Sequence, residues 1–68
     1  MGFERARRGI AERQVASGRQ VIARQRELIA GKKARGLDTA ASEQLLASFE
    51  RSQAVLEEEL AAIEKAGS

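Results

Sequence analysis

The chain has 68 residues, 32% of them charged, a net charge of +2 and no Cys, His or Pro. A domain this small buries only about 60% of its unfolded surface, so it usually needs a disulfide, a metal or a partner subunit. The composition excludes disulfides, thiolate chemistry and the usual zinc sites, which leaves a partner subunit. No apolar run approaches the roughly 20 residues of a membrane span. We therefore expect a soluble, cytoplasmic protein that does not enter a membrane.

Ala, Arg, Glu, Gln and Leu dominate the chain, and all of them are good helix formers. One break, at residues 34–39, interrupts the helical pattern. Gly36 suits the left-handed residue that ends a helix, and Asp38 or Thr39 suits the N-cap of the next helix. We predict an all-α fold over residues 1–68, a single hairpin with helices at about 4–35 and 39–65 and a turn at 36–38.

Both predicted helices repeat apolar or small residues at alternating spacings of three and four, which are the a and d positions of heptads. The first helix supplies Ala11, Val15, Gly18, Ile22, Gln25 and Ile29, and the second supplies Leu46, Phe49, Gln53, Leu56, Leu60 and Ile63. This pattern predicts that the two helices meet along these residues, which we call the seam, as an antiparallel coiled coil.

Charged residues beside the seam favour one register. The e positions of antiparallel helices meet, and one register pairs Arg19 with Glu57, Arg26 with Glu50 and Lys33 with Glu43. The same register places Gln25 opposite Gln53, and we predict that this amide pair sets the register. A slip by one heptad, with Ile22 on Phe49 and Gln25 on Leu46, is the alternative.

The two halves of the chain carry opposite charges. Residues 1–37 have a net charge of +7, whereas residues 38–68 have a net charge of −5. A mildly basic total is weak evidence for nucleic-acid binding, and opposite halves indicate instead that the two helices face each other.

The side of the seam away from these charges is mostly apolar. Its large apolar residues are Ile10, Val21, Leu28, Leu45 and Val55, interrupted by Arg24 and Glu59. A two-helix hairpin has no third layer to cover these five residues, which we call the apolar flank. Because exposed contiguous apolar surface marks interaction sites, we predict a homodimer with a four-helix bundle. Another helical protein is the other candidate partner.

Enzymatic activity is not expected. Without His or Cys, the serines have no neighbouring base. Metal-binding carboxylate bundles use inward-facing Glu-x-x-His motifs, which this chain lacks. The acidic run Glu57–Glu59 points in three directions on a helix, which is typical of a solvated surface. We therefore predict no catalytic residue, no cofactor and no metal site, and a protein–protein interaction module of unknown cellular role.

The arginines of the first helix support an alternative function, binding of RNA or DNA by a hairpin dimer. Arg13, Arg24 and Arg35 recur at eleven-residue spacing, and a row of arginines can contact successive phosphates. The candidate contacts are Arg5, Arg7, Arg8, Arg13 and Arg24. The chain has no Tyr or Trp to stack on bases, and the second helix is acidic, so we rank this function second.

Two segments resemble a known group of proteins. Residues 22–29 read IARQRELI, and residues 36–50 join a Gly-Leu-Asp-Thr turn to Leu45-Leu46-Ala47-Ser48-Phe49-Glu50. Over about residues 14–60 the chain resembles short bacterial helical-hairpin proteins, frequent in alphaproteobacteria, that combine a Gln-Arg-rich helix, a Gly-x-Asp-Thr turn and a Leu-Leu-x-x-Phe-Glu helix. The resemblance implies a hairpin fold and a bacterial origin, and it implies no activity.

Overall fold

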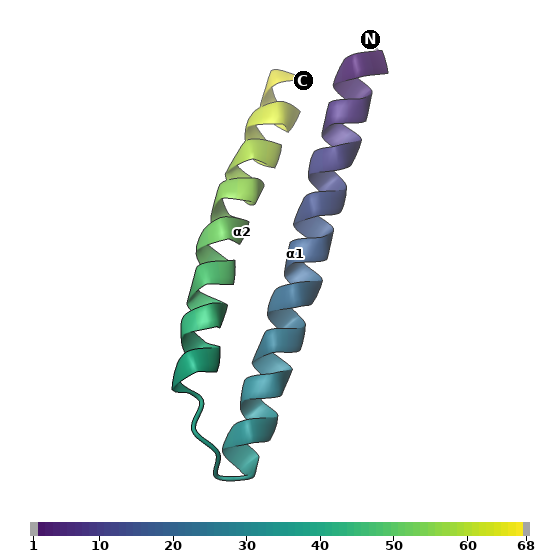
Figure 1. Cartoon of the computed structure of the whole chain (residues 1–68). Coiled ribbons are helices and arrows are strands. Elements are labelled where there is room, and N and C mark those ends of the chain that lie inside the picture. The colour runs from purple at the N-terminus through teal and green to yellow at the C-terminus, as the bar shows by residue number, and fades with distance from the viewer. Residues whose placement is uncertain (1, 68) are drawn as a thin grey trace.

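A computed structural model describes residues 2–67 of the chain, which form two long helices joined by a short turn. Helix α1 spans Gly2–Ala34 and helix α2 spans Ala40–Ala66. The two helices run antiparallel, so that their free ends lie together at one end of the molecule and the turn lies at the other (Figure 1). The predicted all-helical hairpin is confirmed, and each helix begins and ends within two residues of the predicted bounds.

Gly36 ends α1, as the sequence predicted, because its φ of 71° is in the left-handed region. The main-chain N–H of Leu37 donates to the carbonyl of Lys32 at 2.9 Å, and that of Gly36 donates to the carbonyl of Lys33 at 3.0 Å. These two bonds form a Schellman motif, which satisfies carbonyls that the end of the helix would leave without partners. A side chain at residue 36 would strain this conformation.

The start of α2 uses both residues proposed for its cap. The carboxylate of Asp38 accepts a hydrogen bond from the main-chain N–H of Ala40 at 3.0 Å. Thr39 occupies the N-cap position, but its hydroxyl donates to the carboxylate of Glu43 at 3.2 Å and makes no capping bond. Asp38 therefore supplies the side-chain acceptor, while Thr39 holds Glu43 in place.

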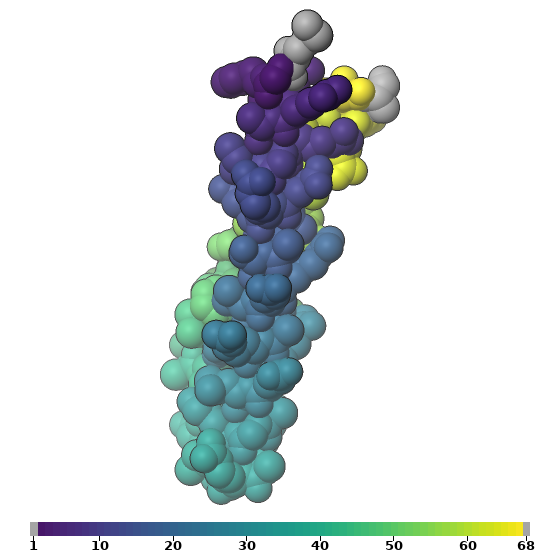
Figure 2. All heavy atoms as spheres, turned by 90° about the vertical axis from the view of Figure 1, so that its right-hand side faces the viewer, coloured from purple at the N-terminus to yellow at the C-terminus, as the bar shows by residue number. Residues whose placement is uncertain are grey.

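The core of this hairpin is a single narrow line. Within residues 2–67, the buried apolar side chains are Val15, Ile22 and Ile29, spaced one heptad apart on α1. The molecule measures 53 × 15 × 14 Å, and Figure 2 shows α1 lying over α2 along this rod. Two helices cannot surround each other, so the large seam residues of α2 remain partly exposed. No helix within the described residues is long and apolar enough to cross a membrane.

Candidate interaction surface

A row of three ion pairs closes one side of the seam. Arg19 pairs with Glu57 at 2.5 Å, Arg26 with Glu50 at 2.8 Å and Lys33 with Glu43 at 3.2 Å. These are the pairs that the heptad analysis predicted, and the prediction is confirmed. All six side chains are between 44% and 68% exposed to water, so each pair contributes only about 0.2–1 kcal/mol, and the row mainly selects how the helices are aligned.

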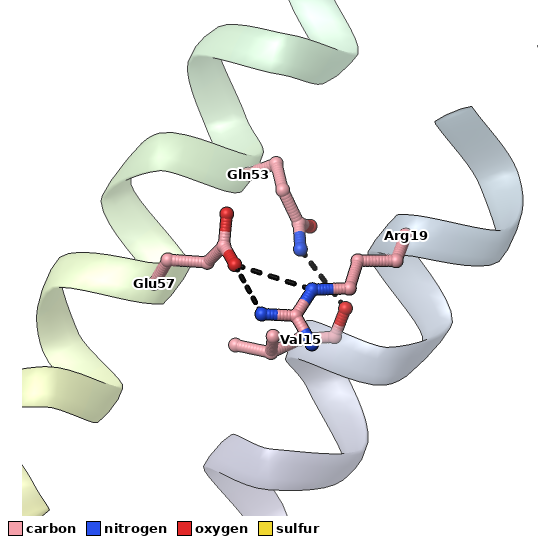
Figure 3. Close-up of polar contacts among 4 residues, drawn as sticks. All are labelled: Val15, Arg19, Gln53 and Glu57. Atoms are coloured by element: carbon pink, nitrogen blue, oxygen red, sulfur yellow. Dashed lines mark hydrogen bonds and ion pairs between the residues drawn. The ribbon is translucent and has the colours of Figure 1, made fainter. Parts of the chain in front are cut away.

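Near the middle of the seam, the polar side chain of Gln53 packs against Gly18. Gln53 is only 6% exposed, and its side-chain amide donates to the main-chain carbonyl of Val15 at 2.9 Å (Figure 3). The carbonyl oxygen of the same side chain occupies the space that a Cβ atom on Gly18 would need. Gly18 therefore lets the side chain of Gln53 lie directly against the backbone of α1.

The second seam glutamine bonds in the same way at the turn end. The amide of Gln25 donates to the main-chain carbonyl of Ser42 at 2.9 Å, and the ammonium group of Lys32 donates to the hydroxyl of Ser42 at 2.8 Å. Ser42 is 8% exposed and was not among the predicted seam residues. Its position continues the spacing of three and four that leads to Leu46 and Phe49, and this is the signal that could have identified it.

The predicted pairing of Gln25 with Gln53 across the seam is wrong. Each amide instead donates to a main-chain carbonyl of the opposite helix. The ion pairs follow the favoured register, whereas contact between Gln53 and Gly18 is the neighbour relationship of the slipped register. The physical reason is the notch at Gly18, because a main-chain carbonyl within reach there accepts the amide.

The five residues of the apolar flank all lie at the surface. Ile10, Val21, Leu28, Leu45 and Val55 are between 46% and 54% exposed. Two further apolar side chains, Phe3 and Leu37, are also exposed, at the two ends of the rod. Within residues 2–67, large apolar side chains are thus more numerous at the surface than in the buried core. The hairpin leaves this flank without cover, as the sequence analysis expected.

A shallow hollow extends the apolar flank toward the free ends of the helices. Ile10 and Ala11 of α1 line it together with Ala62 and Ile63 of α2, and the polar side chains of Arg7, Gln14 and Glu59 also line it. The hollow shows that α1 and α2 do not fill the surface between them near this end of the rod. It provides further apolar area that a partner could cover.

The arginines proposed as phosphate contacts do not form one surface. Arg5, Arg7 and Arg8 line a second hollow at the free ends of the helices, where Arg8 also lies 3.7 Å from Glu12. Arg13 and Arg24 are exposed, and within residues 2–67 they make no ion pair. Arg24 interrupts the apolar flank, so its surroundings differ from those of the three arginines near the free ends.

The described residues hold no group of three or more acidic side chains that could bind a metal ion. Every buried side-chain nitrogen or oxygen atom in this part of the chain has a hydrogen-bond partner. No protein-family model, curated protein or solved structure matches the chain.

Proposed function

We propose that this protein is a small, non-enzymatic interaction module that associates with a second copy of itself through the apolar flank. The observation that supports this most directly is the exposure of the five flank side chains, each close to half exposed, whereas residues 2–67 contain three buried apolar side chains. Apolar surface of this extent on a small protein marks an interaction site. A second hairpin would complete a four-helix bundle.

The energetics favour a second copy as the partner. Covering the exposed half of one flank side chain gains roughly 1 kcal/mol. A two-fold interface brings together both copies of the flank, so the total gain is comparable with the ~4–15 kcal/mol that association costs. The hairpin alone has a single narrow seam, so we expect folding and association to be linked.

A pair of matched double variants tests the proposal. Val21→Glu with Leu28→Glu places two charges on the apolar flank, and we expect a monomer that is largely unfolded at micromolar concentration. Ala23→Glu with Ala30→Glu places the same charges at the same spacing on exposed positions of α1 outside the flank. The control should remain dimeric and folded in light scattering and circular dichroism. Equal loss of association in both variants would contradict the proposal.

Nucleic-acid binding is the second candidate function. The supporting observation is that Arg5, Arg7 and Arg8 line one hollow at the free ends of the helices. Arg13 and Arg24 are also exposed. The acidic α2 adjoins this surface and would repel phosphates, which favours the interaction module.

A further inference from the structure

We infer that the two hairpins pair with their turns at the same end, so that α1 of each copy lies against α2 of the other. This inference rests on the proposed self-association and adds the orientation of the second copy. It follows from three features of the described residues. These are the positions of the flank residues along the rod, the charges of the helices, and the position of Arg24 within the flank.

The ion pair between Arg19 and Glu57 shows which parts of α1 and α2 lie side by side near the centre of the apolar flank. Gln53 lies directly against Gly18, and the longer side chains of Arg19 and Glu57 meet along the same stretch of the rod, so Val21 and Val55 lie within about one and a half helical turns of each other. A second copy turned by 180° about the long axis of the rod keeps these levels. It therefore places Val21 of each hairpin near Val55 of the other.

The turn end of the flank matches in the same way. The ion pair between Lys33 and Glu43 sets the alignment there, and it brings Leu28 and Leu45 within about one helical turn of each other along the rod. In the turns-together dimer, Leu28 of each copy faces Leu45 of the other. Large apolar residues thus meet at both levels without any shift of one hairpin along the other.

The charges of the helices favour this orientation. Residues 1–37, which contain α1, carry a net charge of +7, and residues 38–68, which contain α2, carry −5. With the turns together, the basic helix of each copy lies against the acidic helix of the other. With the turns at opposite ends, α1 lies against α1 and α2 against α2. Like charges then lie within the ~8–10 Å over which charges interact at physiological salt.

Arg24, which interrupts the flank, points to the same orientation. Helical side chains lean toward the N-terminus of their own helix. With the turns together, Arg24 lies on a helix that faces the acidic α2 of the other copy, at least about three turns from Glu59, which lines the hollow beside Ile10 and Ala11. With the turns at opposite ends and the dimer centred on Val21, the two Arg24 side chains lean toward each other instead. The first arrangement places Arg24 against an acidic helix, whereas the second brings two guanidinium groups together.

The distance between the two turns tests the orientation directly. The chain has no Cys, so Leu37→Cys provides a single attachment point for a spin label in the turn, away from the seam and the flank. With the turns together, the labels should lie roughly 10–25 Å apart, one or two helix diameters. A dimer with labels separated by about the 53 Å length of the rod would overturn the inference and leave the proposed self-association intact. A monomer in the same experiment would overturn both.

Discussion

The side chain of Gln53 lies in the notch that Gly18 leaves in α1, with its amide bonded to the main-chain carbonyl of Val15 at 2.9 Å. A polar side chain at a seam position would ordinarily weaken a small hydrophobic core. Here the amide has a partner, and the missing side chain of residue 18 provides its space. The contact joins the two helices at the middle of the rod. It also distinguishes Gly18, which makes room for Gln53, from Gly31 in the same helix, which has no such neighbour.

Gly18→Ala should destabilise the protein, whereas Gly31→Ala should stabilise it. Alanine favours a helix over glycine by up to ~1 kcal/mol at either position. A Cβ atom on residue 18 would displace the amide of Gln53, and leaving a buried amide without a partner costs about 1–3 kcal/mol. A Cβ atom on residue 31 would meet nothing within 4 Å. Urea unfolding of the two variants measures both effects, and equal stabilisation by both would contradict the proposed notch.

Gln53→Leu should leave stability within about 1 kcal/mol of the wild type while making the alignment of the helices less specific. The substitution removes one hydrogen bond but adds apolar surface, and replacing a buried polar group by an apolar one is often nearly neutral. A loss of specificity would appear as extra or broadened amide peaks in a two-dimensional NMR spectrum. A single sharp set of peaks would show that the ion pairs alone fix the register.

The protein should not be retained by duplex or single-stranded nucleic acid at physiological salt. The reason is that acidic residues of α2 adjoin the arginines of α1. Each phosphate contact to duplex DNA would give a salt slope of about −0.9 on a log-log plot. Tight, salt-dependent binding that falls in the Arg13→Glu, Arg24→Glu double variant would favour the nucleic-acid hypothesis. Light scattering of the same variant separates this effect from any loss of association, since Arg24 interrupts the apolar flank.

Several features of the fold could be predicted because residue types and their spacing along the helices determine them. Gly36 tolerates a positive φ that other residues resist, and the three ion pairs follow from heptad spacing between antiparallel helices. The exposure of the apolar flank could be predicted because a fold of two helices has no third layer to cover it. These outcomes depend on the order of residues along each helix more than on the separation between the helices.

The partners of the two seam glutamines could not be predicted from spacing. An amide bonds to whichever acceptor lies within reach, and the acceptors here are the main-chain carbonyls of Val15 and Ser42. Whether a carbonyl is within reach depends on how closely the helices approach, which Gly18 changes locally. The heptad pattern gives the angular position of a residue but not this local separation, so the pattern paired the amides with each other.

The molar mass of the wild-type chain in solution tests the central claim most directly. Light scattering at micromolar concentration should give about twice the 7.4 kDa mass of one chain, with cooperative unfolding whose midpoint rises with protein concentration. Such a concentration dependence is expected because covering the apolar flank stabilises only the associated state. A mass of one chain, together with cooperative unfolding that does not depend on concentration, would contradict self-association through the apolar flank.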